Sequence, residues 1–262
     1  MINKTINKNT KAFFADTPFV KRPSELHKTV ADAVQLVGTP HEADFVLVYG
    51  GDGTMLRAIR EYRHENNAFV GIHGGTVGFL MNESANTVLN ANTLYFNELW
   101  MIQGTIVSDA GEQTFYGFND IWIERSTERV LKIRMRIDGR EVPQIVLADG
   151  IVASTPQGST GYSRAARGKV IMPGVPVMQL TPIAAMVDKT PLGSLILSED
   201  SEVVLALEEQ EKRPARIMAD NRMYELPSWK ELRLKKSNQW VKLGFARENV
   251  FLERIFSAQY HI

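Results

Sequence analysis

The N-terminal part of the chain alternates between short apolar runs and longer segments whose apolar residues recur every three to four positions. Leu26, Val30 and Val34 form such a stripe on a helix that starts near Ser24, and Gly38 and Pro40 are expected to end it. The run 45–49 is too apolar to alternate, which indicates a parallel strand covered on both faces. The predicted strands are residues 11–15, 45–49 and 69–72, and the predicted helices are residues 24–37 and 55–62.

From about residue 94 the apolar positions recur every second residue, which is typical of strands. Asp138-Gly139, between two alternating segments, indicates a two-residue hairpin turn. The strand–helix–strand order before residue 97 implies right-handed crossovers in a parallel sheet. We therefore expect a Rossmann-like α/β domain over residues 1–97 and a β-rich, sandwich-like domain over residues 98–247. The strands predicted in the second domain are residues 94–107, 114–123, 130–137, 142–152, 179–186, 194–197, 202–207, 215–218, 230–234 and 240–245.

Composition narrows the possible functions. The chain has 262 residues with 44% hydrophobic and 23% charged content, which is ordinary for a globular protein. Because 30 basic residues balance 30 acidic ones, the charge expected of a nucleic-acid-binding protein is missing. No Cys is present, which excludes disulfides, thiolate metal sites and Cys nucleophiles. No long apolar segment suggests a membrane span or a signal peptide, so we expect a soluble, cytoplasmic protein.

The stretch Gly50-Gly51-Asp52-Gly53-Thr54 joins the apolar run 45–49 to the next helix. Glycines without Cβ atoms let a polyanion approach bare N–H groups, and a helix N-terminus adds positive potential there. A carboxylate beside a phosphate is electrostatically unfavourable unless it accepts a proton or holds a metal. Asp52 is therefore a candidate for chemistry, and the alternative is that it simply caps the helix.

Three further stretches carry candidate binding residues. Residues 74–79 form a second glycine-rich loop after a predicted strand, at the edge where open α/β sheets bind ligands. Residues 154–163 form a small, hydroxyl-rich loop in which Tyr162 could stack on a base, although a long β-turn fits the same pattern. Asn119-Asp120 offers an amide and a carboxylate near a strand start, but alone such a pair is more often a turn.

These stretches, together with Asp149-Gly150 and Ala219-Asp220-Asn221, resemble NAD kinases in order and approximate spacing, over about residues 44–173 and more weakly beyond. The loop 154–163 is the discriminating motif, because lipid kinases and phosphofructokinases carry loops like 50–54. The resemblance implies a two-domain kinase that phosphorylates the 2′-hydroxyl of the adenosine ribose of NAD, with ATP or polyphosphate as donor and Mg²⁺ or another divalent cation. It also implies a homodimer or homotetramer, and a C-terminal segment, residues 248–262, that returns to the first domain.

The same resemblance implies a role for each matching residue. Asp52 would be the general base, Gly53 would lie beside the phosphates in the loop of Gly50, Gly51 and Thr54, and Phe79 would lie beside the adenine. The remaining implied substrate-binding residues are Arg57, Asn119, Asp120, Asp149, Thr160, Gly161, Tyr162, Ser163, Ala165, Asp220 and, from a neighbouring subunit, Ala184. Arg57 could equally be a solvated helix residue.

Several positions depart from the family pattern, and most of them lie on the nicotinamide side. Asp120 replaces the usual Glu, Ala165 replaces a common Ser, and Leu147 stands where a basic residue is frequent. The usual Gly-Gly-Pro and His-Pro features appear as residues 167–169 and 172–173. Two alternatives therefore stay open at this point: a lipid or sugar kinase that shares the GGDGT loop, and a non-catalytic NAD(P)-binding regulator.

Overall fold

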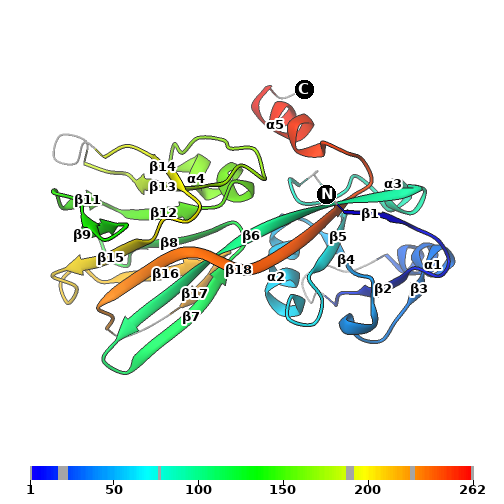
Figure 1. Ribbon diagram of the computed structural model, residues 1–262, viewed down its shortest axis with the longest axis horizontal. Helices are drawn as coiled ribbons and strands as arrows, with labels where there is room; N and C mark the ends of the chain where they lie inside the picture. The colour runs from blue at the N-terminus through cyan, green and yellow to red at the C-terminus, as the bar shows by residue number, and fades with distance from the viewer. Residues whose placement is uncertain (1, 17–22, 76–77, 187–191, 225–227, 261–262) are drawn as a thin grey trace. The chain divides into compact units, whose positions relative to one another are not determined.

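The computed structural model describes residues 2–16, 23–75, 78–186, 192–224 and 228–260, with side chains as far as residue 256. The chain divides into two compact units (Figure 1). Unit 1 comprises residues Met1–Leu99 and Trp240–Ile262, and unit 2 comprises residues Trp100–Gln239. Within the described part of the chain, no helix combines the length and the apolar character needed to cross a membrane.

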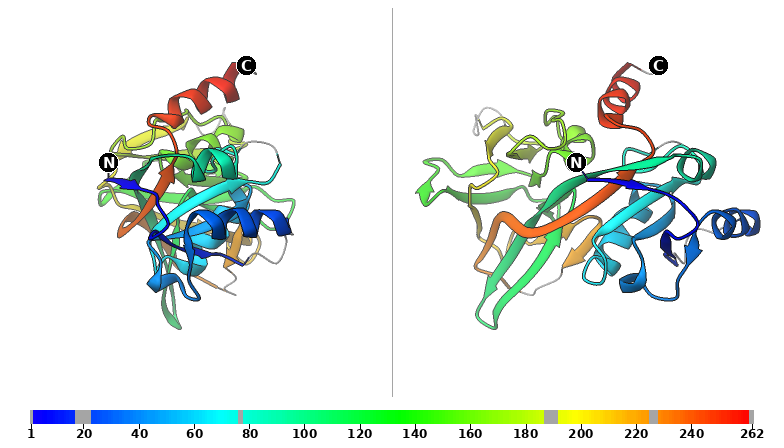
Figure 2. Two further views of the ribbon diagram at one scale, coloured as in Figure 1. Left: turned by 90° about the vertical axis from the view of Figure 1, so that its right-hand side faces the viewer. Right: turned by 45° about the vertical axis from the view of Figure 1, so that its right-hand side comes forward.

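Unit 1 is built on parallel strands in the order β5-β4-β2-β3, and the end of β18 adds to β5 in the same direction. Five of the six residues of β4 are buried, as expected for a strand covered on both faces. β1 pairs antiparallel with the start of β6, which the views of Figure 2 also show. The elements are β1 (Ile2–Thr5), β2 (Lys11–Phe14), α1 (Ser24–Ala33), β3 (Gln35–Leu36), η1 (Pro40–Glu42), β4 (Phe45–Gly50), α2 (Asp52–Tyr62), β5 (Ala68–His73), α3 (Ala85–Leu89) and α5 (Val250–Tyr260).

The first helix is shorter than the apolar stripe predicts. Helix α1 ends at Ala33, and Val34 is extended, with φ −139° and ψ 161°. The next two residues form β3 and pair with β2, so sheet hydrogen bonds replace the last predicted helical turn. Val34 remains buried at 3% exposure, which explains why an apolar residue suits this position in either a helix or an extended segment.

Unit 2 consists of two sheets around one core. One sheet has the order β14-β13-β12-β8-β16-β17, and the other contains β10, β9, β15, β11 and β7 together with parts of the long strands β6 and β18. The core cluster draws buried side chains from strands of both sheets, which is the packing of a β-sandwich. The elements are β6 (Thr93–Ser108), β7 (Gly111–Gly117), β8 (Asp120–Arg125), β9 (Leu131–Ile137), β10 (Arg140–Glu141), β11 (Val146–Ala148), β12 (Gly150–Ser154), η2 (Gln157–Thr160), α4 (Tyr162–Ala165), β13 (Val177–Ile183), β14 (Leu195–Ser198), β15 (Val203–Glu208), β16 (Ala215–Ala219), β17 (Arg222–Tyr224) and β18 (Glu231–Phe245).

Two predicted strands are each divided at a point where the chain changes sheet. The predicted strand 114–123 becomes β7 in one sheet and β8 in the other, with Phe118 and Asn119 between them. The predicted strand 142–152 likewise becomes β11 and β12, with Asp149 between them. A continuous period-two pattern survives such a change, because both halves still bury alternate residues in the shared core. Conversely, the predicted strands 230–234 and 240–245 are one strand, β18.

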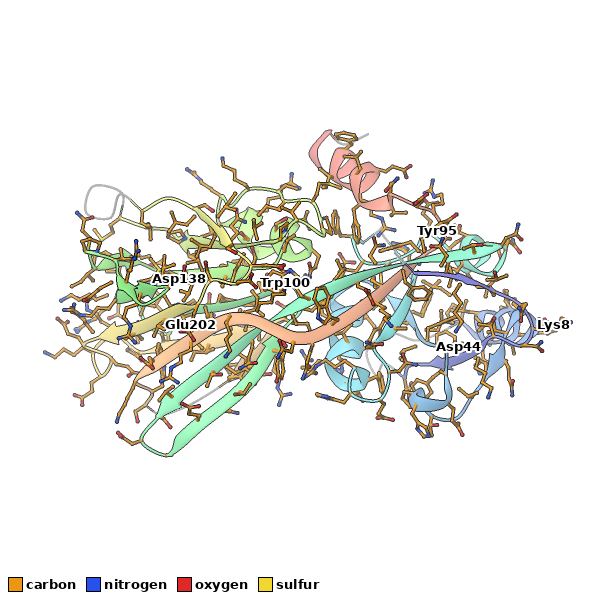
Figure 3. The ribbon with its side chains drawn as sticks, viewed as in Figure 1. Lys8, Asp44, Tyr95, Trp100, Asp138 and Glu202 are labelled. Carbon is orange, nitrogen blue, oxygen red and sulfur yellow. The ribbon has the colours of Figure 1, made fainter. Side chains whose placement is uncertain are left out.

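The hairpin prediction is confirmed. Asp138 and Gly139 both have positive φ, 50° and 76°, and Ile137 pairs with Arg140 across the turn. The Asp138 carboxylate accepts a hydrogen bond from the Glu202 backbone N–H at 2.9 Å; both residues are labelled in Figure 3. The turn is therefore tied to the strand β15 that starts next to it.

Candidate active site

The GGDGT turn begins with a backbone conformation that requires glycine. Gly50, the last residue of β4, has φ +150°, and a Cβ there would lie 2.5 Å from Thr54 Oγ1. A Cβ on Gly51 or Gly53 would meet none of the described atoms within 4 Å. The protein itself therefore demands the first glycine only, whereas the next two leave open space beside the N-terminus of α2, where the first N–H groups have no intrahelical acceptor.

Asp52 does not cap its own helix. The N-cap of α2 is Gly51, and no side chain caps it. The Asp52 carboxylate instead accepts a hydrogen bond from the Phe79 N–H at 2.7 Å and another from the Leu80 N–H at 2.8 Å. Half-buried, it joins the two glycine-rich loops, so the capping interpretation is wrong for this residue.

The second glycine-rich loop approaches Asp52 closely enough to require Gly78. A Cβ on Gly78 would overlap Asp52 Oδ1 and would lie 2.8 Å from its Cγ. The Phe79 ring, which the sequence suggested for the adenine, stacks on Phe251 of α5 at 5.5 Å between ring centroids. Residues 76 and 77 of this predicted loop lie outside the described residues.

In unit 2, strand β8 separates an apolar face from a polar one. Ile121 and Ile123 point into the core, so Asp120, Trp122 and Glu124 lie on the opposite face. Tyr162, at the start of α4, packs edge-on against Trp122 with ring centroids 5.1 Å apart, and its hydroxyl donates to Glu124 Oε2 at 3.3 Å. The predicted aromatic residue of the hydroxyl-rich loop therefore lies over the polar face of β8.

Asp120 and Asp220 form a buried pair of acids, each 5% exposed. The Asp220 carboxylate accepts hydrogen bonds from the backbone N–H groups of Phe118 at 2.6 Å and Asn119 at 2.8 Å. Burial, together with the nearby Asp220 charge, raises the pKa of Asp120 well above its usual value. Asp120 therefore favours its neutral acid form, in which it can donate a hydrogen bond.

Buried polar atoms without partners gather around Asp120. Asn119 Oδ1, Trp122 Nε1 and Ser154 Oγ are buried, and no described group hydrogen-bonds to them. Ser154 lies directly opposite Asp120 in the pairing of β12 with β8. Unpaired buried polar groups are uncommon in folded proteins, and a concentration of them is typical of places that receive a polar ligand or ordered water.

A cavity of about 450 Å³ lies beside Tyr162 and is lined by two ion pairs. Asp149 Oδ1 lies 2.8 Å from Arg125 Nε, and Glu124 Oε1 lies 2.6 Å from Arg216 Nε. The sequence pointed to Asp149, Tyr162 and the loop that starts at Ser154, but not to Trp122, Glu124, Arg125 or Arg216. The period-two pattern of β8 places Glu124 on the same face as Asp120, and this pattern could have identified Glu124. Arg216 reaches that face because β16 pairs with β8, and no local sequence pattern predicts that pairing.

Some predicted binding residues have structural contacts that account for them. Ser163 is buried, and its hydroxyl accepts a hydrogen bond from Gln179 Nε2 at 2.8 Å and lies 3.1 Å from Thr181 Oγ1. Asp220 has φ 45° and Asn221 has φ 64°, as in the tight hairpin turn between β16 and β17. The Ser163 contacts anchor α4, and the Asp220 carboxylate anchors the 118–120 turn.

The remaining predicted residues lie around η2 and α4, after β13, and on α2. Thr160 is half-buried, and Gly161 and Ala165 are exposed around the start and end of α4. Ala184 follows β13, is exposed, and has an unusual φ of 45°. Arg57 is a half-buried residue of α2. Among the described residues, no group of three or more His, Asp or Glu side chains could hold a metal ion.

Comparisons with known proteins identify the family. An ATP-NAD kinase N-terminal domain model matches residues 4–98, and an ATP-NAD kinase C-terminal domain model matches residues 119–243. An NAD kinase of Brucella suis biovar 1 (strain 1330) is 31% identical over 225 residues, which are 84% of this chain and 86% of that protein. An NAD kinase of Xylella fastidiosa (strain 9a5c) is also 31% identical, over 84% of this chain and 85% of the relative.

Two solved structures share the fold. A yeast NADH kinase in complex with NADH aligns with a TM-score of 0.78 and 17% identity, over 95% of this chain and 87% of that one. An NAD kinase from Archaeoglobus fulgidus in complex with ATP aligns with a TM-score of 0.71 and 22% identity, over 97% and 99%. With both domain models matched and curated relatives above 30% identity, the chain belongs to the ATP-NAD kinase family.

Proposed function

We propose that this protein transfers the γ-phosphoryl group of ATP to the 2′-hydroxyl of the adenosine ribose of NAD, producing NADP. The family assignment favours this reaction over the lipid- or sugar-kinase alternative. The observation that carries the proposal is the state of Asp52. Its carboxylate is half-buried, stands at the N-terminus of α2, and is held by two backbone N–H groups.

Asp52 acts as the general base in this proposal. A carboxylate has about four lone-pair positions on its two oxygens. The Phe79 and Leu80 N–H groups use two of them, which leaves others to accept the proton of the ribose hydroxyl. Phosphoryl transfer depends mainly on alignment and charge stabilisation, so a base held in one orientation meets its main requirement. The open space at Gly51 and Gly53 suits the phosphates, and Arg57 adds a positive charge one turn further along α2.

The dinucleotide-binding residues of unit 2 have two roles in the proposal. Asn119 and Asp120, with unpaired or neutral polar atoms, bind the adenine or its ribose, and Asp220 orients them by holding their backbone. Asp149 and Tyr162 bind the nicotinamide half in their 450 Å³ cavity. The residues beside Tyr162 in η2 and α4 support this binding site in the proposal: Thr160, Gly161, Ser163 and Ala165.

In this proposal, a divalent cation bound to ATP would neutralise charge on the phosphates. The donor set described above does not provide a cage of protein ligands. Mg²⁺ commonly keeps water ligands and binds mainly through substrate phosphates, so such a cation would arrive with ATP rather than reside in the protein. We therefore assign no protein ligand to it. Polyphosphate as an alternative donor, a cytoplasmic location, and a homodimer or homotetramer in which Ala184 faces the neighbouring subunit remain parts of the proposal.

The decisive experiment incubates purified protein with NAD, ATP and Mg²⁺ and measures NADP by chromatography. We expect NADP to form, and we expect Asp52→Asn to lower kcat by roughly 10²–10⁴-fold, the usual contribution of a general base. Calorimetric titration with NADP should give similar affinity for both proteins, and thermal melting should confirm that the variant is folded. Absence of NADP from the parent reaction would refute the activity, and parental turnover by the Asn variant would refute the base assignment.

A further inference from the structure

Helix α5, which begins at Val250, contributes an arginine that the proposed chemistry does not use. Arg254 Nη1 donates a hydrogen bond to the Phe79 carbonyl oxygen, and Arg254 Nη2 donates to the Met81 carbonyl oxygen. The two NH₂ groups of one guanidinium thus hold two carbonyls of the second glycine-rich loop. A planar guanidinium can span two acceptors in this way, whereas a Lys ammonium on its flexible stem is a point donor.

The surroundings of Arg254 fix the guanidinium in place. It lies over the Phe245 ring, 4.8 Å from the ring centroid. Phe251 packs edge-on against Phe245 at 5.1 Å and stacks on Phe79 at 5.5 Å. Burial lowers the pKa of Arg254 to about 10, and the charges of Asp52 and Glu83 act in the opposite direction. Arg254 therefore stays positively charged at neutral pH.

The loop that Arg254 holds is the same loop that holds Asp52. Phe79 donates its N–H to Asp52 Oδ2 and accepts a hydrogen bond from Arg254 at its carbonyl oxygen. Leu80 donates to Asp52 Oδ1, and its neighbour Met81 accepts the second bond from Arg254. Residues 79–81 therefore lie between the carboxylate and the guanidinium, bonded to each through separate backbone groups.

We propose that Arg254 is a positioning residue that orients the Asp52 carboxylate through the backbone of residues 79–81. Its catalytic consequence rests on the proposed role of Asp52 as general base. Without the two carbonyl bonds, the loop loses the anchor that aims its N–H groups at Asp52. The carboxylate then occupies several orientations, and a fraction of them cannot reach the hydroxyl.

The first test compares Arg254→Lys and Arg254→Met with the parent in steady-state kinetics. We expect kcat to fall about tenfold for Arg254→Lys and about a hundredfold for Arg254→Met, since small misplacements of catalytic groups carry costs of this size. The KM for NAD should stay within about twofold, because an interaction that acts only on the chemical step leaves substrate binding intact. An equal rise in KM with unchanged kcat would overturn the proposal.

A double-mutant cycle separates positioning from general support of the fold. In an Asp52→Asn background, Arg254→Lys should cause no further loss of kcat, because there is no base left to orient. If the two losses multiply instead, Arg254 does not act through Asp52. Arg247→Met is the matched control: Arg247 precedes α5, pairs with Glu83 and Glu253, and is half exposed, so its variant should keep the parental kcat.

A measurement of loop stability tests the proposal without relying on turnover. Hydrogen exchange of the Phe79 and Leu80 amides, followed by NMR, should accelerate at least tenfold in Arg254→Lys and stay unchanged in Arg247→Met. Unchanged exchange in a folded Arg254→Lys variant would overturn the proposal. Should Asp52→Asn keep the parental kcat, the general-base assignment fails and with it the catalytic consequence of Arg254, while the exchange rates still decide whether Arg254 holds the loop.

Discussion

Asp52 in unit 1 and Asp220 in unit 2 use their carboxylates in the same way but in different surroundings. Each carboxylate accepts hydrogen bonds from consecutive backbone N–H groups of a turn that is distant in the sequence. Asp52 is half-buried, and the charge of Arg254 interacts with it. Asp220 is 5% exposed, and its charge adds to the effect of burial in raising the pKa of another acid, Asp120.

The difference shows that hydrogen bonds from backbone N–H groups do not by themselves assign a chemical role to a carboxylate. We call such a set of hydrogen bonds to one carboxylate a clamp. A carboxylate at the start of a helix that two backbone N–H groups hold is kept in one orientation, from which it can reach a substrate proton. Asp220 holds the backbone of a turn, and burial together with its charge shifts the ionisation of Asp120 toward the neutral form. Variants at and around the two carboxylates test this difference between a catalytic and a structural role.

The largest effect is expected on stability, from Asp220→Ala. The substitution leaves the Phe118 and Asn119 N–H groups without their acceptor, at about 1–3 kcal/mol for each buried unsatisfied group. Asn221→Ala is the matched control, because Asn221 shares the positive φ of this turn. Urea unfolding should give a free energy of unfolding at least about 2 kcal/mol lower for Asp220→Ala than for the control. Equal losses would show that backbone strain, rather than the clamp, matters at this turn.

The second variant breaks the other clamp. A Cβ at Gly78 overlaps the Asp52 carboxylate, whereas a Cβ at Gly75 meets none of the described atoms within 4 Å. We expect Gly78→Ala to lower kcat about a hundredfold through displacement of the base, with little change for Gly75→Ala. Steady-state NADP formation measures both. A fully active Gly78→Ala enzyme would contradict the view that the orientation of Asp52 matters.

The third variant separates the needs of the ligand from those of the fold. Gly53 is exposed in the first turn of α2, and no described atom lies within 4 Å of the position that a Cβ would take. Gly53→Ala should raise the melting temperature, because Ala favours a helix over Gly by about 1 kcal/mol. It should also raise the KM for ATP roughly tenfold, equivalent to about 1.4 kcal/mol, if phosphates approach this backbone. A KM for ATP at the parental value would place the phosphates elsewhere.

The smallest effect concerns pH and the acid pair. Because the pKa of Asp120 is raised in the folded protein, its native state holds a proton that the unfolded chain releases. Stability from this group is therefore complete below the ordinary pKa of Asp and is lost as pH rises toward the raised value. Asp120→Asn removes the ionisation, so its melting temperature should exceed that of the parent by a few degrees at alkaline pH and match it at acidic pH. A constant difference across pH would mean that Asp120 does not titrate in this way.

Part of the fold and the site follows from local sequence. The period-two segments, the Asp138-Gly139 hairpin, and the strand–glycine–helix order around Asp52 all appear in the structure. Local patterns could not show where the chain changes sheet, because Asn119 and Asp149 interrupt strands whose alternation continues on both sides. They also could not show which backbone groups contact Asp52 and Asp220, since those groups are distant in the sequence.

By itself, the sequence determined which turns contain bare backbone, which strands are buried, and that a carboxylate stands among the glycines of the first loop. These properties depend on residues within a few positions of one another, and a local pattern records them. Only the tertiary structure decided which groups each carboxylate contacts. The N–H groups that clamp Asp52 lie 27 and 28 residues away, those that clamp Asp220 lie more than 100 residues away, and Arg254 reaches its carbonyls across 175 and 173 residues. Electrostatic environment is a sum over neighbours in space, and chain folding brings those neighbours together.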